Sequence, residues 1–451
     1  MKADLLVLGA GPGGYETALS AAKGGKSVIL FNGGKLGGTC LNEGCIPTKC
    51  LCRNAEVISL LKEGDKFGID DFTFTVNYNK LISRKEEVID NLRSGVETML
   101  SQAKVNIINA NATFKDSKTV IANGQEFSGE NIIIATGSLS KSLPIPGHDL
   151  ECVMDSKRLL NLEYIPASLT IIGGGVIGME FASIFHQLGS KVTVIEFMKQ
   201  ILPPFDSDIS KRLKQILSKK GINIITGAAA KEIRQNEFYE IEVVYEVKGK
   251  EEVVTSSDLL MAVGRVPNVE GLNLAVAGID YSKNGIPVDD FMQTNVPGIY
   301  AIGDVNARIM LAHVATMQGE RALNVINGFK DNIRFDLIPS AVFTVPECGM
   351  VGKTEQQCKE ENLEISIGTS FYRANGKALA MGDTDGLCKL IFRKSDSILI
   401  GAHIIGVEAA DLAQQCCNLM NRNVTIKELK EIIFGHPTIS EVIISAARSV
   451  R

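Results

Sequence analysis

The chain has 451 residues, of which 45% are hydrophobic, and a formal net charge of −5. This length predicts two to four domains, and mild acidity without a basic block argues against a nucleic-acid partner. Ten cysteines are too few for a disulfide scaffold in so long a chain, and no apolar run approaches the ~20 residues that span a bilayer. Because the first strand begins at Asp4, we expect no signal peptide and a cytoplasmic protein.

The first apolar strand, Leu5–Leu8, leads into a glycine motif, a helix and a second strand at Val28–Phe31. Gly9, Gly11 and Gly14 form a G-x-G-x-x-G pattern. In a dinucleotide-binding unit the first glycine permits the turn, the second lets the backbone approach a pyrophosphate, and the third allows close helix–strand packing. Taken alone the motif is a weak signal, because a purely structural glycine turn has the same residues.

The same pattern recurs at Gly173, Gly175 and Gly178, again between two apolar strands. Two such units in one chain predict two bound nucleotides. The second copy ends its second strand with Glu196, the acid expected to bind the ribose hydroxyls of an adenine dinucleotide. This acid would repel a 2′-phosphate, which favours NAD over NADP. In the first copy the equivalent residue is Asn32.

The remaining chain alternates between helical and strand patterns. Helices are expected at 80–103, 312–327, 409–421 and 426–433. Strands are expected at 105–128, 132–135, 222–254, 259–263, 298–304, 389–393 and 398–405. The section after Pro339 has no glycine-rich phosphate loop, which predicts a third domain that binds no nucleotide.

Two cysteines five residues apart, Cys40 and Cys45, lie in a glycine-rich stretch at 37–49. Residues five apart in a regular helix have Cα atoms roughly 8.6 Å apart, whereas a disulfide needs about 4.4–6.8 Å. If the two bridge, we expect Cys40 in irregular backbone and Cys45 near the start of a helix at 50–62. A cytosolic disulfide is more often catalytic than structural. The alternative is two small buried hydrophobes, but the flanking glycines, Pro47 and Lys49 favour a redox pair.

Near the C-terminus, His436 is followed by Pro437 and, five residues on, by Glu441. This pattern is compatible with a general base and its orienting carboxylate. From spacing alone, an ordinary loop histidine explains it better. Cys416 and Cys417 lie in an apolar helical stretch and are expected in the core.

As a set, these motifs resemble those of the flavoprotein disulfide reductases. The motifs that carry the resemblance are the redox box at 37–49, both glycine motifs, Ala-Thr-Gly at 135–137, Gly-Arg-Val-Pro-Asn at 264–268, Ile-Gly-Asp at 302–304 and His-Pro-Thr-x-Ser-Glu at 436–441. They occur in the family's order and span essentially the whole chain. The resemblance is closest to the members that serve 2-oxoacid dehydrogenase and glycine-cleavage complexes.

The resemblance implies an α/β fold with two Rossmann-like dinucleotide-binding domains, for FAD and NAD, and a C-terminal α+β dimerisation domain. The FAD domain would comprise 1–146 and 269–337, the NAD domain 147–268 and the interface domain 338–451. The implied reaction oxidises dihydrolipoamide to lipoamide and reduces NAD to NADH. The implied partners are a second copy, and the lipoyl domains and acyltransferase core of a 2-oxoacid dehydrogenase complex or a glycine-cleavage lipoyl protein.

The resemblance also implies the roles of individual residues. Cys45 would be the thiol on the flavin side, and Cys40 the thiol that meets the substrate. His436 and Glu441 would complete the active site of the other subunit, and Glu180 would be the acidic partner of Lys49. The implied FAD residues are Gly9, Gly11, Gly14, Asn32, Lys49, Thr136, Gly137, Asp304 and Ala312. The implied NAD-site residues are Gly173, Gly175, Gly178, Glu180, Glu196 and Gly264.

The chain departs from the family pattern at Asn32, where an acid is usual, and at Glu43 and Thr48 inside the redox box. A glutathione-reductase-like enzyme is the nearest alternative. It would be expected to have alanine at Gly178 and arginines after the second strand, and Glu196 argues against it. A non-catalytic structural flavoprotein subunit is the alternative from another class, and the intact redox box argues against it.

Overall fold

Strands and helices alternate along the chain, as expected from the sequence. The computed structural model describes residues 1–450. These elements form two units. Unit 1 consists of Met1–Cys50, Asn79–Lys141 and Gly264–Ile333, and unit 2 contains the segments between and after these. The chain therefore passes between the units several times, and α3 (Cys45–Lys62) itself crosses from unit 1 into unit 2.

Unit 1 is built on a seven-stranded sheet in the order β3-β2-β1-β6-β5-β4, with β17 also pairing with β6. Its strands are β1 (Lys2–Leu8), β2 (Val28–Phe31), β3 (Asn106–Ile108), β4 (Thr113–Phe114), β5 (Thr119–Ala122), β6 (Gln125–Ile134) and β17 (Ile299–Ala301). The central strand β1 pairs in parallel with both β2 and β6. Leu5, Leu6 and Val7 are fully buried, which explains the continuous apolar run of this strand.

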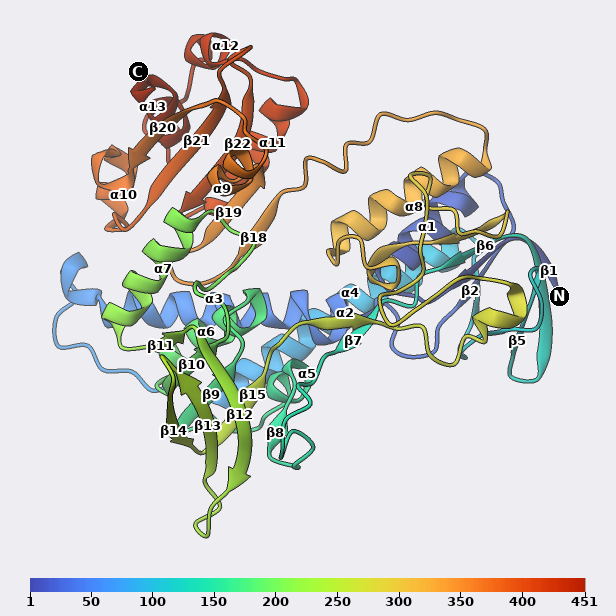
Figure 1. Cartoon of the computed structure of the whole chain (residues 1–451), viewed down its shortest axis with the longest axis horizontal. Coiled ribbons are helices and arrows are strands. Elements are labelled where there is room, and N and C mark those ends of the chain that lie inside the picture. Colours follow the sequence, from blue (N-terminus) through green and yellow to red (C-terminus); the bar gives the residue numbers. More distant parts are fainter. Residues whose placement is uncertain (451) are drawn as a thin grey trace. The chain divides into compact units, whose positions relative to one another are not determined.

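The helices of unit 1 complete the dinucleotide-binding arrangement. They are α1 (Pro12–Lys23), α2 (Gly38–Glu43), α4 (Tyr78–Gln102), α8 (Ala312–Ile326) and the 3₁₀ turns η2 (Leu274–Ala277) and η3 (Gly303–Asn306). Figure 1 shows α8 running beside α1. Gly319 allows the two helices to pack closely, since a Cβ atom there would overlap the hydroxyl of Thr17. A two-stranded ribbon, β7 (Ser138–Ser140) with β16 (Arg265–Pro267), also belongs to this unit.

Unit 2 contains a second parallel sheet in the order β11-β10-β9-β15-β8. Its strands are β8 (Val153–Met154), β9 (Ser168–Ile172), β10 (Lys191–Glu196), β11 (Asn223–Thr226) and β15 (Asp258–Met261). Helices α5 (Ser156–Leu160), α6 (Val176–Leu188) and α7 (Ser207–Lys220) accompany it, with an antiparallel sheet of β12 (Ala228–Gln235), β13 (Ile241–Val247) and β14 (Lys250–Ser256). The order of β9, α6 and β10 repeats that of β1, α1 and β2.

The C-terminal part of unit 2 is a five-stranded antiparallel sheet in the order β18-β19-β22-β21-β20. The strands are β18 (Ser340–Val342), β19 (Cys348–Gly352), β20 (Ile365–Phe371), β21 (Leu387–Arg393) and β22 (Leu399–Ile405). The helices are α9 (Glu355–Glu360), α10 (Gly376–Met381), α11 (Ala409–Asn421), α12 (Ile426–Glu431) and α13 (Glu441–Ser449), with the 3₁₀ turn η4 (Tyr372–Ala374) between β20 and α10. The 3₁₀ turn η1 (Gly64–Phe67) lies elsewhere in unit 2. Helix α11 packs on β19 and β22, and α13 packs on β20 and β21.

Most predicted elements are present, but some bounds differ and several elements were not predicted. Helix α3 begins at Cys45 rather than at residue 50, and residues 125–134 form one strand rather than two. The elements that were not predicted are strands β7, β8, β16 and β18 to β20 and helices α2, α5, α7, α9, α10 and α13. Cys416 and Cys417 are buried in α11 within the core of the C-terminal sheet, which confirms their expected place.

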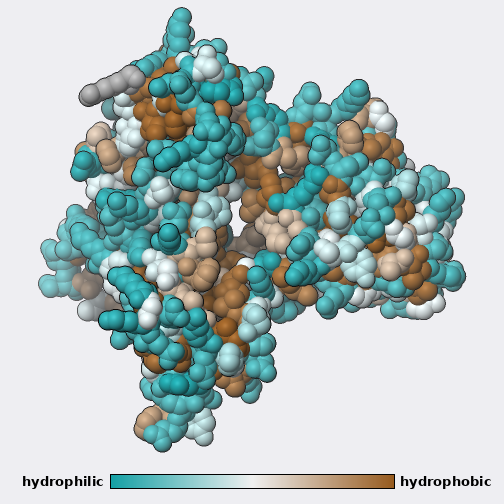
Figure 2. All heavy atoms as spheres, viewed as in Figure 1, coloured by the Kyte–Doolittle hydropathy of each residue, from teal (hydrophilic) through white to brown (hydrophobic). Residues whose placement is uncertain are grey.

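Figure 2 shows a largely hydrophilic surface that is interrupted by separate hydrophobic patches. Within residues 1–450, none of the helices combines the length and the hydrophobicity that crossing a bilayer requires. The same residues contain no group of three histidines, cysteines or acids placed to hold a metal ion.

Candidate active site

Cys40 and Cys45 form a disulfide, and their Cα atoms are 4.6 Å apart. Cys40 lies in the short helix α2, and Cys45 is the first residue of α3. Gly44 separates the two helices, with φ −148° and ψ −103°, which brings the cysteines closer than a continuous helix allows. The predicted pairing and the predicted place of Cys45 are confirmed. The expectation of irregular backbone at Cys40 was wrong, because the break falls at Gly44 instead.

The disulfide loop is fixed against the first glycine motif. The N–H of Gly37 donates to the carbonyl oxygen of Ala10 at 2.9 Å. Gly38 has a φ of 60°, and a Cβ atom there would lie 2.6 Å from the Cα of Gly11. A side chain at Gly38 would therefore push α2 away from the phosphate loop.

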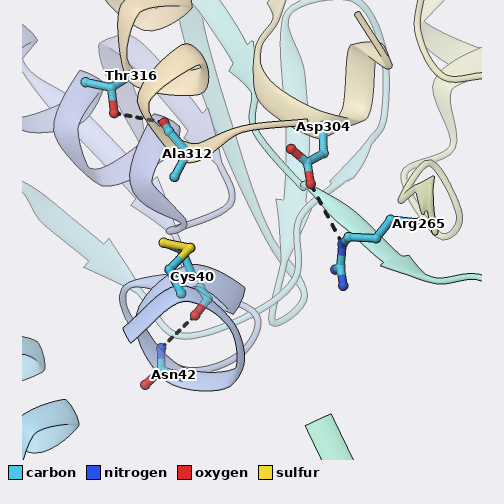
Figure 3. The surroundings of a disulfide bond; sticks show 8 residues. Cys40, Asn42, Arg265, Asp304, Ala312 and Thr316 are labelled. Carbon is cyan, nitrogen blue, oxygen red and sulfur yellow. Dashed lines mark hydrogen bonds and ion pairs between the residues drawn. A yellow bond between two sulfur atoms is a disulfide. The ribbon is translucent and has the colours of Figure 1, made fainter. Parts of the chain in front are cut away.

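Asn42, between the two cysteines, holds the loop in shape. Its Nδ2 donates to the carbonyl oxygens of Leu36 at 3.0 Å and Gly38 at 2.9 Å. Its Oδ1 accepts from Nε of Arg93 at 3.0 Å. Figure 3 shows Asn42 on the same helical turn as Cys40. Sequence reasoning counted Asn42 in the motif but gave it no role.

The first glycine motif closes a tight loop between β1 and α1. A Cβ atom at Gly9, whose φ is 108°, would overlap the carbonyl oxygen of Ala135 at the end of β6, and one at Gly14 would overlap the carbonyl oxygen of Gly9. Gly11, the N-cap of α1, has open space at its Cβ position. The loop is open only where a pyrophosphate would meet the free N–H groups of the first helical turn.

The second glycine motif repeats this geometry residue by residue. A Cβ atom at Gly173 would overlap the carbonyl oxygen of Ala262, and one at Gly178 would overlap that of Gly173. Gly175, the N-cap of α6, again has open space. The residues present therefore fit two dinucleotides, one at each motif.

The two copies differ at the residue expected beside the ribose. Glu196 ends β10 and is 7% exposed, and its carboxylate accepts from the backbone N–H groups of Gly174 at 2.5 Å and Met198 at 2.6 Å. Asn32 follows β2, and its Nδ2 donates to Oδ1 of Asn109 at 3.2 Å. The second copy thus presents a carboxylate at this position and the first copy a neutral amide.

Asp304 lies in η3, between β17 and α8, rather than in a strand as predicted. Its Oδ2 accepts from the hydroxyl of Ser138 at 2.5 Å and lies 3.9 Å from Nε of Arg265. Figure 3 shows Arg265 facing Asp304, and Ala312 at the start of α8, where its carbonyl oxygen accepts from Thr316. Sequence reasoning missed Ser138 and Arg265. Ser138 directly follows the Ala-Thr-Gly motif, and Arg265 is the second residue of the Gly-Arg-Val-Pro-Asn motif, which was the available signal.

The Ala-Thr-Gly and Gly-Arg-Val-Pro-Asn motifs are bonded to each other. The hydroxyl of Thr136 donates to the carbonyl oxygen of Asn268 at 2.7 Å, and the N–H of Asn268 donates to the carbonyl oxygen of Gly137 at 2.9 Å. Gly264 has a φ of 106° and leads into β16. Thr136, Gly137 and Gly264 therefore lie in one network within unit 1.

Lys49 lies in the first turns of α3, four residues after Cys45. Glu180 lies in α6, is 3% exposed, and accepts at Oε1 from the N–H of Phe343 at 3.0 Å. One turn further on, the hydroxyl of Ser183 accepts from the N–H of Val345 at 3.1 Å. Lys49 and Glu180 belong to different units, and their pairing stays a prediction.

His436 and Glu441 form the predicted pair, with Nδ1 of His436 3.1 Å from Oε2 of Glu441. The other carboxylate oxygen, Oε1, accepts from the N–H of Thr438 at 2.9 Å. This N–H and the imidazole hold the pKa of Glu441 below its ordinary value. The His436 side chain is 77% exposed, so an oriented imidazole with a charged partner projects from the surface of unit 2.

Neither additional cysteine of α3 has the features of a redox thiol. Cys50 and Cys52 are both buried. Burial raises the pKa of Cys50, against the opposing effect of Arg84, and a thiol with a raised pKa is a poor nucleophile. The disulfide at Cys40 and Cys45 is therefore the redox centre that this part of the chain provides.

Comparison with known proteins decides the family. Residues 3–319 match the model of the pyridine nucleotide-disulphide oxidoreductases, and residues 338–447 match the dimerisation domain of the same family. The chain belongs to the pyridine nucleotide-disulphide oxidoreductase family. Membership confirms the predicted α/β fold, the oxidoreductase activity and the cofactors FAD and NAD. The dimerisation domain supports the predicted homodimer.

Individual members of this family match the chain along its whole length. A dihydrolipoyl dehydrogenase of Bacillus subtilis is 37% identical and covers 99% of this chain and 98% of its own. One of Geobacillus stearothermophilus is 38% identical, with coverage of 99% and 96%. Among solved structures, the HOCl-induced flavoprotein disulfide reductase RclA from Escherichia coli is 30% identical, with a TM-score of 0.89 and coverage of 99% and 100%.

Proposed function

We propose that this chain is a dihydrolipoyl dehydrogenase, which oxidises dihydrolipoamide to lipoamide and reduces NAD to NADH. The observation that carries the proposal is the Cys40–Cys45 disulfide at the start of α3. This disulfide lies in a chain about 37% identical to dihydrolipoyl dehydrogenases over nearly its full length. The loop of the disulfide is bonded to the first glycine motif, which supports electron exchange with a cofactor held there.

The residues that would hold the two cofactors divide between the two glycine motifs. FAD would lie at Gly9, Gly11 and Gly14, with Asn32, Lys49, Thr136, Gly137, Asp304 and Ala312 as further contacts. NAD would lie at Gly173, Gly175 and Gly178, with Glu180, Glu196 and Gly264 nearby. FAD held at the first glycine motif would supply the redox chemistry that links the two-electron cysteine pair to hydride transfer with NAD.

The chain's own residues carry the sulfur chemistry. His436, oriented by Glu441, accepts a proton from one thiol of dihydrolipoamide, and the resulting thiolate attacks the sulfur of Cys40. The Cys40–Cys45 bond breaks, and Cys45 leaves as a thiolate. The second substrate thiol then attacks the substrate sulfur of the mixed disulfide, and Cys40 leaves and takes up the proton of that thiol. Cyclic lipoamide is released, and both cysteines are left reduced.

A second copy of the chain would complete each active site. His436 lies on the C-terminal segment that matches the dimerisation domain, and its exposed imidazole is suited to act on a disulfide of the partner subunit. The domains proposed for the chain are 1–146 with 269–337 for FAD, 147–268 for NAD and 338–451 for the dimer interface. The proposed substrate carriers are the lipoyl domains and acyltransferase core of a 2-oxoacid dehydrogenase complex, or a glycine-cleavage lipoyl protein.

The test compares dihydrolipoamide oxidation with NAD in the native chain and in Cys45→Ser. The native enzyme should turn over dihydrolipoamide, with NAD strongly preferred to NADP. The variant should lose this activity, because no disulfide is left to accept the thiols, while it still oxidises NADH with an artificial acceptor that bypasses the cysteines. Unchanged dihydrolipoamide turnover in Cys45→Ser would refute the assignment.

The same assay tests the nearest alternative, a disulfide reductase of another substrate class. Purified enzyme is given NADH or NADPH with glutathione disulfide in place of lipoamide. Gly178, where a Cβ atom would overlap the carbonyl oxygen of Gly173, and Glu196 both favour the lipoamide reaction with NAD. Faster turnover of glutathione disulfide than of lipoamide would replace the proposal by this alternative.

A further inference from the structure

Asp304 is held by a relay of two side chains, Ser138 and Arg265, to which the family resemblance gave no role. The hydroxyl of Ser138 donates to Oδ2 of Asp304 at 2.5 Å. The same hydroxyl accepts from Nε of Arg265 at 2.7 Å. Each group therefore has a fixed direction of donation, from guanidinium to hydroxyl to carboxylate.

Arg265 donates two hydrogen bonds to Ser138. Besides the bond to the hydroxyl, its terminal nitrogen donates to the carbonyl oxygen of Ser138 at 2.7 Å. The guanidinium Nε also lies 3.9 Å from Oδ2 of Asp304, and Figure 3 shows the two side chains facing each other. A planar guanidinium can make such a two-point contact, whereas an ammonium group acts as a point donor.

The relay joins two segments that are far apart in the chain. Ser138 opens β7 and Arg265 opens β16, and these strands pair antiparallel, with Pro267 opposite Ser138. Strand β7 is the last element before unit 1 ends at Lys141, and β16 the first after it resumes at Gly264. Both ends of the intervening segment are thereby tied to Asp304.

The backbone around Asp304 is fixed independently, from α8. Gln318 is 2% exposed, and its Oε1 accepts from the N–H of Gly303 at 2.7 Å and from Nδ2 of Asn306 at 2.9 Å. Because Gln318 fixes the backbone on both sides of Asp304, the carboxylate can move only by rotation about its side-chain torsions. The hydrogen bond from the Ser138 hydroxyl to one carboxylate oxygen restricts this rotation.

We propose that Arg265 and Ser138 are positioning residues that preorganise the Asp304 carboxylate for the flavin. The inference rests on the proposed function, in which Asp304 binds the ribityl chain of FAD. A carboxylate whose rotation is already restricted loses less conformational entropy when it accepts hydrogen bonds from the ribityl hydroxyls. Arg265 and Ser138 act through Asp304 and touch neither the reacting sulfurs nor the substrate.

The test measures the rate of FAD release from the full-length holoenzyme, followed by the rise of flavin fluorescence. Ser138→Ala and Arg265→Met should each release FAD roughly tenfold faster than the native chain, since each breaks a bond to a charged group. Arg265→Lys should recover part of the loss, because it keeps the charge and one donor. The double variant, Ser138→Ala with Arg265→Met, should release FAD no faster than either single variant, because both substitutions interrupt the same relay.

The matched control is Arg308→Met. Arg308 also bonds a backbone carbonyl, that of Val288, and forms an ion pair with Asp290 at 3.3 Å, but it has no bond to Asp304. Its FAD release should match that of the native chain.

A cycle with Asp304→Asn separates positioning from general stabilisation. If Arg265 acts through Asp304, Arg265→Met should add little to the release rate of Asp304→Asn. Native release rates in Ser138→Ala, or full additivity in this cycle, would overturn the inference. Because Ser138→Ala removes one oxygen atom, it keeps the test valid even where Arg265→Met fails to fold. A chain that binds FAD but does not oxidise dihydrolipoamide would refute the proposed function alone.

Discussion

The ammonium group of Lys389 lies 3.0 Å from Oδ1 of Asp206, and both side chains are almost fully buried. Lys389 also bonds the carboxylates of Asp208 at 2.7 Å and Glu355 at 2.6 Å. Burial acts to lower the pKa of Lys389, but these three acids together raise it. The ammonium on β21 therefore ties the start of α7 to the C-terminal sheet.

Replacing Lys389 by methionine should destabilise unit 2 strongly. The change leaves Asp206 as a buried carboxylate without its cation, which costs about 3–5 kcal/mol. Burial alone would raise the pKa of Asp206, but its charged neighbours and the N–H of Glu355 lower it. The contribution of the pair is therefore present above the ordinary carboxyl pKa and is lost as the pH falls. The melting temperature of the variant should be several degrees below that of the native chain near neutral pH. This difference in melting temperature should become smaller at acidic pH.

Lys353→Met is the control for this prediction. Lys353 forms an ion pair with Glu361 at 2.6 Å, and both side chains are at least 40% exposed. Exposed pairs contribute about 0–1 kcal/mol, so this variant should melt close to the native chain. Equal melting temperatures for the two lysine variants would show that the buried ammonium does not stabilise unit 2.

Glu347, after the cis Val345–Pro346 bond, should make stability depend on pH near neutrality. Burial, with the charges of Glu56, Asp411 and Glu408, raises its pKa to about 7, although the N–H of Ala410 opposes this. A carboxyl whose folded pKa is raised binds its proton more tightly in the folded state. Its ionisation therefore costs stability as the pH rises from the ordinary carboxyl pKa through 7.

Glu347→Gln should remove this cost. The variant should be more stable than the native chain at pH 8, by about 3 kcal/mol, and about equally stable at pH 4.5. Melting temperatures at the two pH values measure the difference. Glu360→Gln, at an exposed acid of α9, is the control with the same change in charge. A gain in stability that does not vary with pH would contradict the raised pKa.

The glycine motifs and the redox box could be predicted because each depends on residues close together in the chain. The helix was predicted to start at residue 50, whereas α3 begins at Cys45 and Pro47 is its third residue. Proline fits anywhere in the first turn, since those N–H groups have no partner within the helix. A helix signal from proline therefore leaves the start uncertain by a few residues.

The parts that could not be predicted depend on residues far apart in the chain. Ser138 and Arg265 are 127 positions apart, and Lys389 and Asp206 are 183 apart. No local pattern indicates contacts over such separations. Strand β20, Ile365–Phe371, was overlooked although its isoleucines and Phe371 recur at every second or fourth position.

Asn42→Ala should slow reduction of the disulfide without breaking it. The amide holds α2 through the carbonyl oxygens of Leu36 and Gly38, and Arg93 loses its acceptor when the amide is removed. Loss of such bonds costs about 1–3 kcal/mol in positioning, so dihydrolipoamide turnover should fall roughly tenfold. Stopped-flow measurement of enzyme reduction by dihydrolipoamide checks this. Reduction at the native rate would mean that the loop keeps its shape without Asn42.

Glu196→Gln should weaken both the use of NADH and the choice against NADPH. The carboxylate accepts from the N–H groups of Gly174 and Met198, and the glutamine NH₂ cannot accept from either. One N–H group near the phosphate loop is then left unpaired, so the KM for NADH should rise about tenfold. Loss of the negative charge removes repulsion of a 2′-phosphate, so the preference for NADH over NADPH should shrink. Glu237→Gln, an exposed acid in the turn after β12, controls for the change in net charge. A native KM for NADH in the Glu196→Gln enzyme would show that this carboxylate does not contribute to binding the nucleotide.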